Sequence, residues 1–88
     1  MVLIVVSVYD RASDAFGRPL FVAAVGQAIR SFQDEINRDE PNNAMAAHSD
    51  DFDLFQLGTF DDSTGSLVAC EPKQLAIGKQ LRVYASKA

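Results

Sequence analysis

The run FDLFQLGTFDDSTGSLVAC, residues 52–70, carries the clearest structural signal in this chain. At its centre, residues 61–65 read Asp-Asp-Ser-Thr-Gly, a short segment of turn formers that ends in glycine. Such a segment between two apolar arms is typical of a β-hairpin. We therefore predict antiparallel strands over residues 52–60 and 66–70.

The first arm of this hairpin also indicates which side chains share a face. Side chains alternate between the two faces of a strand. Strict alternation predicts Phe52, Leu54 and Phe60 on one face, and Phe55 and Leu57 on the other.

The residues upstream of the hairpin predict one strand and one helix. Residues 2–9 are nearly all β-branched or aromatic, which favours a central strand buried on both faces. Residues 23–38 then change to a helical period. The predicted helix has no capping side chain at its N-terminal end. Arg30 and Asp34 are four residues apart, the spacing of a helical ion pair. The apolar stripe of this helix is Val25, Ala28, Ile29, Phe32 and Ile36.

The remaining segments complete an α+β prediction. Residues 39–51 read as a polar loop with an alanine-rich turn around Met45. Residues 73–84 fit either a helix around 74–77 or a strand around 81–84. The predicted fold is a small antiparallel sheet with one amphipathic helix packed on it, in the order β-α-β-β, followed by a variable C-terminal tail. We expect Phe32, Phe52, Leu54 and Ile29 to form the core.

The length of the chain bears on its assembly. The 88 residues fit a single domain over residues 1–88. A domain of this size buries only about 60 to 65% of the surface that its unfolded chain exposes. One helix also covers little of a chain that is 48% hydrophobic. We therefore expect a homo-oligomer.

Charge is unevenly distributed along the sequence. The net charge is −4, which argues against a surface that grips phosphate everywhere. Residues 1–30 carry three bases and two acids, residues 31–62 one base and nine acids, and residues 63–88 four bases and one acid. Any contact with nucleic acid is therefore expected from the two ends of the chain and not from its middle.

Few residues suit catalysis, metal binding or membrane insertion. Cys70 is the single cysteine and is expected to be buried, and His48 is the single histidine. No nucleophile stands near His48, so we expect no catalytic residues, no cofactor and no enzyme activity. Residues 2–6 are too short to span a bilayer, and we expect no signal peptide or membrane anchor.

Aspartates gather around the hairpin without the spacing of a metal site. The five are Asp50, Asp51, Asp53, Asp61 and Asp62. Their spacing does not fit a calcium loop, whereas Asp61 and Asp62 are common turn formers that bond backbone two residues on. We predict no metal site.

Bases outside the acidic middle are the candidate nucleic-acid-binding residues. Single strands are held by basic grooves together with aromatic stacking platforms. Tyr9, Phe21 and Tyr84 are candidate platforms, although Phe21 also suits the core. The candidate bases are Arg11, Arg18, Arg30, Lys73, Lys79 and Arg82.

Several stretches together resemble a known phage family. They are the Tyr9-Asp10 strand end, the pair Pro19 and Phe21, the helix segment Ala28-Ile29-Arg30-Ser31-Phe32, and His48-x-x-Asp51-Phe52-x-Leu54-x-x-Leu57-Gly58-x-Phe60-Asp61-x-x-Thr64-Gly65. In order and spacing they are similar to the small nonstructural protein of gokushovirus-type microviruses, which are phages with single-stranded DNA genomes.

The resemblance implies a non-enzymatic accessory protein, located in the host bacterial cytoplasm and absent from the mature virion. It implies a role in the switch from duplex genome replication to single-stranded DNA synthesis and packaging. The implied partners are single-stranded or duplex DNA, or viral replication and capsid proteins. A module that docks on a viral or host replication protein without touching DNA is the alternative. In the resemblance, Arg30 matches the arginine of the family's helix. Three roles are open for Arg30: contact with DNA, an ion pair with a carboxylate such as Asp34, or a place in a subunit interface.

Overall fold

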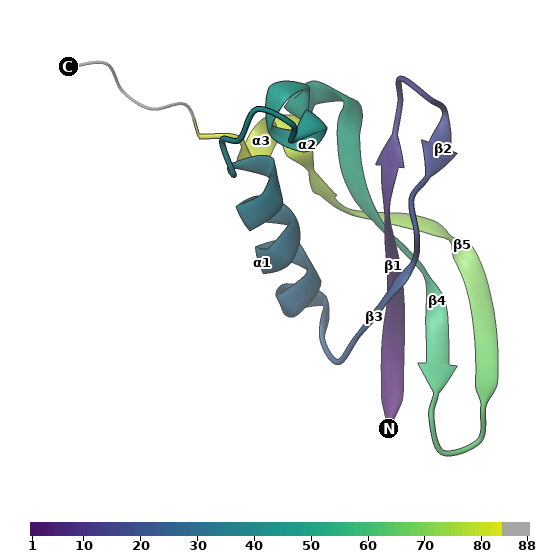
Figure 1. Ribbon diagram of the computed structural model, residues 1–88. Helices are drawn as coiled ribbons and strands as arrows, with labels where there is room; N and C mark the ends of the chain where they lie inside the picture. The colour runs from purple at the N-terminus through teal and green to yellow at the C-terminus, as the bar shows by residue number, and fades with distance from the viewer. Residues whose placement is uncertain (84–88) are drawn as a thin grey trace.

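The computed structural model describes residues 1–83, and one antiparallel sheet organises them (Figure 1). The elements in chain order are β1 (Val2–Asp10), β2 (Ala15–Phe16), β3 (Leu20–Val22), α1 (Val25–Ile36), α2 (Ala44–Ala47), the 3-10 helix η1 (Ser49–Asp51), β4 (Phe52–Asp61), β5 (Ser66–Ile77) and α3 (Gly78–Leu81).

The sheet has five strands with β1 near its middle. The main order is β2-β1-β4-β5, and β3 pairs with β1 on the same side as β2. Val5, Val6 and Ser7 are buried in succession, so the prediction of a central strand buried on both faces is confirmed for its middle. The α+β prediction is also confirmed, but the order β-α-β-β omitted two short strands. Two and three residues are too few to give a periodic signal.

Helix α1 covers one face of the sheet and supplies three of the five buried residues of the core cluster. Ala28, Phe32 and Ile36 are buried against Val6 and Leu54. Ile29 and Phe52 pack against this cluster, as the helical stripe predicted. The helix is two residues shorter at each end than expected, and Ala24 indeed provides no side-chain cap.

A bulge in β4 reverses the predicted facing of Phe60. Val5 pairs with Gly58, but the next residue, Val6, pairs with Gln56, so Leu57 is an extra residue in β4. An extra residue shifts the alternation by one position. Phe60 therefore lies on the opposite face from Leu54, where strict alternation had placed both together.

Glycine is required beside this bulge. A Cβ atom at Gly58 would lie 2.2 Å from the carbonyl oxygen of Val68 on β5. Since this neighbour is backbone, it cannot move aside without disturbing the sheet. The close approach of β4 and β5 therefore depends on the missing side chain.

Residues 66–81 are part of the fold. β5 continues to Ile77, so the predicted helix around 74–77 is wrong. The alternative strand around 81–84 would begin at the last residue of α3, and its end lies outside the described residues. Pairing with β4 holds the strand through residues whose own sequence is polar. Helix α3 follows, and a Cβ atom at Gly78 would meet the carbonyl oxygens of Phe52 and Ser49. The candidate platform Tyr84 lies outside the described residues.

The hairpin turn matches its prediction. Asp61 accepts hydrogen bonds from the backbone and the hydroxyl of Ser63, at 3.0 and 2.6 Å. Gly65 has a φ of +76°, a conformation that side chains disfavour. Turn chemistry and glycine placement thus set the hairpin. Among residues 1–83, no helix has the length and apolar character needed to cross a membrane.

A candidate binding face of aromatic side chains

Five aromatic rings lie on the face of the sheet that α1 leaves uncovered. We call this set the aromatic face: Tyr9, Phe16, Phe21, Phe55 and Phe60. Three rings form one cluster, with centroids 4.9 to 6.1 Å apart. Phe21 and Phe60 form a second, edge-on pair at 5.4 Å. Both arrangements are ordinary favourable aromatic contacts.

Strand register explains why these rings gather. In β1, even-numbered residues such as Val6 and Val8 face the helix, so Tyr9 and Ser7 face the other way. Phe55 is the partner of Ser7, and Phe16 is the partner of Tyr9. Paired residues share a face. The rings cover Val5 and Ser7, which are 7% and 1% exposed, without being covered themselves.

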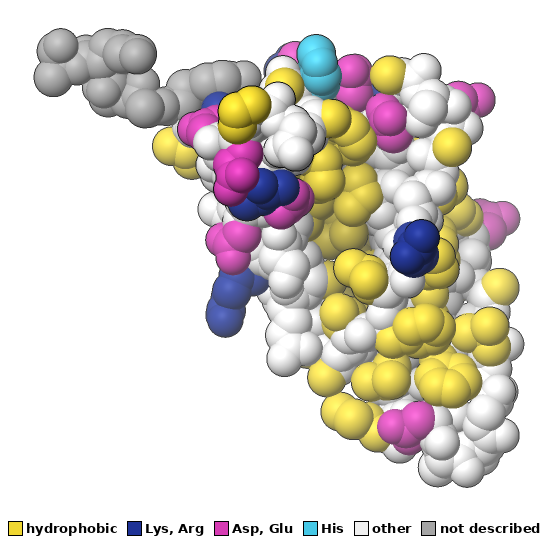
Figure 2. Space-filling model, in the orientation of Figure 1, with side chains coloured by type: hydrophobic (Ala, Val, Ile, Leu, Met, Phe, Trp, Pro, Cys, Tyr) yellow, Lys and Arg dark blue, Asp and Glu magenta, His cyan; other side chains and the backbone are white. Residues whose placement is uncertain are grey.

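Exposure of the rings separates this face from the core. Phe16 is 40% exposed and Phe21 is 50% exposed. The interpretation of Phe21 as a core residue is therefore wrong, because β3 turns its side chain away from α1. Figure 2 shows hydrophobic side chains gathered over the lower part of the sheet. Contiguous apolar surface of this kind commonly marks an interaction site.

The charges at the margin of the aromatic face are mixed. Arg11 follows Tyr9 by two residues, and Arg18 is within three residues of both Phe16 and Phe21. Tyr9 donates a hydrogen bond to Asp14, and this bond raises the pKa of the Tyr9 hydroxyl. Cations and carboxylates therefore alternate along this edge.

Asp53 anchors one end of the face from a buried position. Its carboxylate is 3% exposed and pairs with the guanidinium of Arg11. It also accepts hydrogen bonds from Nε2 of Gln74 at 3.1 Å and from the backbone N–H of Gly78 at 3.3 Å. Arg11 donates a further bond to the carbonyl of Asp50, and its bond to Asp53 raises its pKa. This network ties β1, β4, β5 and α3 together.

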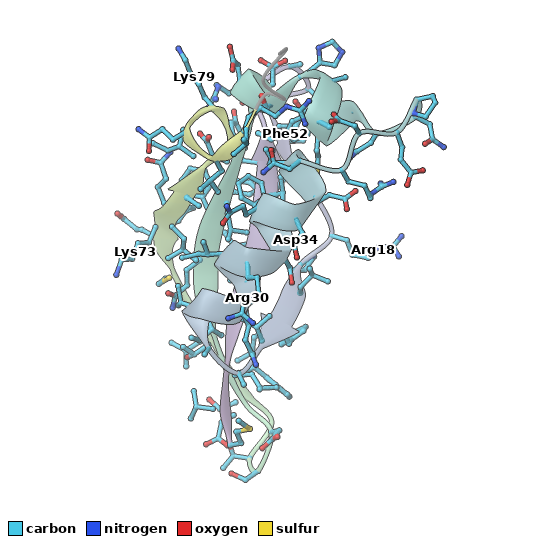
Figure 3. The ribbon with its side chains drawn as sticks, turned by 90° about the vertical axis from the view of Figure 1, so that its left-hand side faces the viewer. Arg18, Arg30, Asp34, Phe52, Lys73 and Lys79 are labelled. Atoms are coloured by element: carbon cyan, nitrogen blue, oxygen red, sulfur yellow. The ribbon has the colours of Figure 1, made fainter. Side chains whose placement is uncertain are left out.

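The predicted basic residues are not brought together. Figure 3 places Arg18 and Lys73 at opposite edges of the sheet, Arg30 on α1 and Lys79 on α3. Arg82 is bound to Asp39 at 2.6 Å and to the carbonyl of Ile36 at 3.0 Å. Arg30 and Asp34 form no ion pair within residues 1–83. Arg11 and Arg18 are thus the two candidate bases that border the aromatic face.

The other candidate residues have mostly local contacts. Asp61 holds the hairpin turn, and Asp62 pairs with the N-terminal ammonium at 2.7 Å. Asp50 and Asp51 lie in η1, beside the exposed His48. Cys70 is exposed, contrary to the prediction of a buried thiol, because β5 is an edge strand.

An apolar groove lies between α1 and the sheet. It has a volume of about 300 Å³ and opens on the side of β3. Val6, Leu20, Phe32 and Met45 line it, and Glu35 is the acidic group in its wall. Figure 2 shows this groove as a hydrophobic strip between the helix and the strands. It is a second surface suited to an apolar partner.

Sequence reasoning found the aromatic residues but not the face that they make. Two signals were present: Gly58 inside a strand, which often marks a bulge, and Phe16 close to the following turn at Gly17. Together they could have predicted a shift in alternation and a short strand that pairs with the end of β1.

Comparison with known proteins gives one match. Residues 3–81 match the family model described as Phage ORF5 protein. No curated protein and no solved structure is significantly similar to the chain. The matched region includes every residue of the aromatic face.

Proposed function

Because the chain belongs to the Phage ORF5 protein family, we propose that it is a non-enzymatic phage accessory protein that binds single-stranded DNA on its aromatic face. It acts in the cytoplasm of the infected bacterium and is absent from the virion. Through this binding it favours single-stranded DNA synthesis and packaging over duplex replication. The resemblance to the gokushovirus nonstructural protein supports the role in this switch.

The observation that carries the proposal is the uncovered aromatic face. Bases of a single strand stack on exposed aromatic rings, and each stacked base contributes about 1 to 3 kcal/mol. Stacking depends little on base sequence, which suits a protein that binds single-stranded DNA of any sequence. Phe16 and Phe21 are exposed enough to receive bases.

The charges at the edge favour single-stranded over duplex DNA. Arg18 can contact phosphates, whereas Arg11 is held by Asp53 and the carbonyl of Asp50, and Asp10 and Asp14 repel phosphates. One available base gives a shallow dependence of affinity on salt. A duplex hides its bases from the rings and depends on phosphate contacts, so it gains little on this surface. We therefore expect weak, stacking-driven binding to single strands.

Fluorescence anisotropy with labelled oligothymidine and a duplex of equal length, at two salt concentrations, tests this proposal. We expect binding of the single strand, and Phe21→Ala should weaken it about fivefold to a hundredfold, the equivalent of one stacked base. Leu20→Ala is the matched control, since Leu20 is 59% exposed but lines the groove on the opposite face. Equal loss in both variants, or no binding by the wild type, would refute the proposal.

The groove favours a second candidate function. In this alternative, the chain docks on a viral or host replication protein through the groove and touches no DNA. Its apolar walls and its single carboxylate, Glu35, suit an apolar protein segment better than a phosphate backbone. Loss of replication control in infected cells with Leu20→Ala, but not with Phe21→Ala, would favour this alternative.

A further inference from the structure

Strand β5 leaves one long edge of the sheet unpaired. It has 12 residues, and among residues 1–83 it pairs only with β4. Every residue from Ser66 to Gln74 is exposed. The opposite edge is built from the short strands β2 and β3, which Pro19 and its neighbours separate. A long open edge presents unpaired backbone groups that can bind another strand.

The free part of this edge is residues 66–70. These five residues, Ser-Leu-Val-Ala-Cys, carry no charge. Figure 1 shows that this end of the hairpin extends past the N-terminal end of α1. Leu67 and Val68 are 65% and 58% exposed, and as neighbours they point to opposite faces. Beyond them, Pro72 has no N–H, so pairing is disfavoured there.

We propose that residues 66–70 pair in antiparallel fashion with the same residues of a second copy of this chain. The two-fold axis passes through Val68, so that each Val68 faces its counterpart. In this register Leu67 faces Ala69 and Ser66 faces Cys70 of the other copy. The two sheets become one, which goes beyond the proposed DNA binding and does not depend on it.

Charge complementarity favours a second copy as the occupant. The same register brings Lys73 beside residue 63 in the hairpin turn of the other copy, next to the carboxylates of Asp61 and Asp62. Figure 3 shows Lys73 at the edge of β5, directed away from the sheet. Within residues 1–83 it has no ion pair in its own chain. The symmetry forms this contact twice.

The dimer also extends the aromatic face. Leu67 is the β4–β5 partner of Phe60, and Ala69 is the partner of Gly58. Both therefore share a face with the aromatic rings. Joining the edges places Leu67 of each copy against Ala69 of the other, so the apolar surface runs without a break from one copy to the other.

A charge at the two-fold axis tests the register. Light scattering of the wild type at micromolar concentration should give twice the 9.6 kDa of one chain. Val68→Lys places two like charges opposite each other and should give monomers, and so should Val68→Glu. An equal mixture of the two variants should restore the dimer. Circular dichroism verifies that each variant folds.

Disulfide trapping tests the same register independently. In the proposed register, residue 66 faces Cys70 of the other copy. Ser66→Cys should therefore form a disulfide with that Cys70 under mild oxidation, because facing residues in antiparallel strands lie about 4.5 to 5.5 Å apart, within the range of a disulfide. The two Cys70 residues of a wild-type dimer lie roughly 13 Å apart along the strands and should not crosslink. Ser13→Cys, in an exposed turn far from β5, is the matched control.

The outcomes separate this dimer from the alternatives. A monomeric wild type, a mixture that stays monomeric, or equal crosslinking of Ser66→Cys and Ser13→Cys would each overturn the proposal. A dimer that Phe16→Ala dissociates and Val68→Lys does not would assign the interface to the aromatic face. DNA binding by a monomeric Val68→Lys protein would leave the proposed function intact while the dimer fails.

Discussion

The two faces of the sheet contain similar residues but have different surroundings. On one face, Val6 and Leu54 are 1% and 3% exposed beneath α1. On the other, Phe16 and Phe21 stay 40% and 50% exposed. Burial of apolar area stabilises a fold in proportion to the area removed from water. The helix-covered face therefore holds the fold together, whereas the aromatic face is available for binding.

Hydrophobic content alone therefore does not locate a core. Helix α1 has 12 residues, enough to cover part of one face of the sheet. The aromatic rings contact one another and shield Val5 and Ser7, but within the described residues Tyr9, Phe55 and Phe60 stay only half-buried and Phe16 and Phe21 stay exposed. A protein that keeps such a surface exposed gains a place for a ligand or a partner at the risk of aggregation.

The largest expected effect comes from the covered face. Phe32→Ala should cost about 3 to 5 kcal/mol, because it removes a ring that is 3% exposed and leaves a cavity between α1 and the sheet. That loss is enough to unfold a domain of marginal stability. Thermal denaturation measures it, with Phe16→Ala as the control from the aromatic face. Similar melting temperatures for the two variants would contradict the division into faces.

A smaller loss is expected from the buried carboxylate on the aromatic side. Asp53→Ala should cost about 1 to 3 kcal/mol, since it leaves the N–H of Gly78 buried without its acceptor and releases Arg11. Urea denaturation measures the change. Asp50→Ala is the control, because Asp50 is exposed and offers Arg11 only its backbone carbonyl. Equal stability of Asp53→Ala and the wild type would show that the network is dispensable.

The covered face was largely predictable from sequence, because a helical period is a local signal. The stripe that includes Ala28, Phe32 and Ile36 could be read directly, and so could the turn that ends at Gly65. The predicted core of Phe32, Leu54, Ile29 and Phe52 is confirmed. In each case, residues close in sequence determine the structure.

The aromatic face was not predictable in the same way, because it depends on register between distant strands. The extra residue Leu57 moves Phe60 from one face to the other, and only the pairing of β4 with β1 reveals it. The burial of Asp53 likewise depends on β5 and α3, which return to it from 21 and 25 residues away. The bases were visible in the sequence, but their scatter over α1, β5, α3 and the intervening loops was not.

Removing a ring from the aromatic face should affect stability less than removing Phe32. Phe16→Ala should lose roughly 0.5 to 1.5 kcal/mol of contacts with Tyr9 and Phe55, in addition to the apolar area that this 40% exposed side chain buries. Chemical denaturation measures this cost, and anisotropy with a single strand measures binding in the same sample. We expect the larger change in binding. A large loss of stability with unchanged binding would reverse the roles assigned to the two faces.

The smallest expected effect is electrostatic and lies at the hairpin tip, beyond both faces. Hydrogen bonds from the hydroxyl and the backbone N–H of Ser63 lower the pKa of Asp61 below its usual value of 3.8. Since the folded-state pKa is the lower one, the stabilising contribution of Asp61 is complete above pH 3.8 and is lost as the pH falls through the folded-state pKa.

Ser63→Ala tests this contribution by removing the hydroxyl donor and keeping the backbone N–H. The pKa of Asp61 should rise toward 3.8, so acid unfolding should begin at a slightly higher pH while stability near neutral pH decreases only slightly. Titration of the Asp61 carboxyl carbon by NMR measures the pKa directly. Ser66→Ala is the control, because its hydroxyl does not contribute to the shift. An unchanged pKa in Ser63→Ala would mean that the backbone N–H of Ser63 and the hydroxyl of Thr64 hold the carboxylate ionised without the Ser63 hydroxyl.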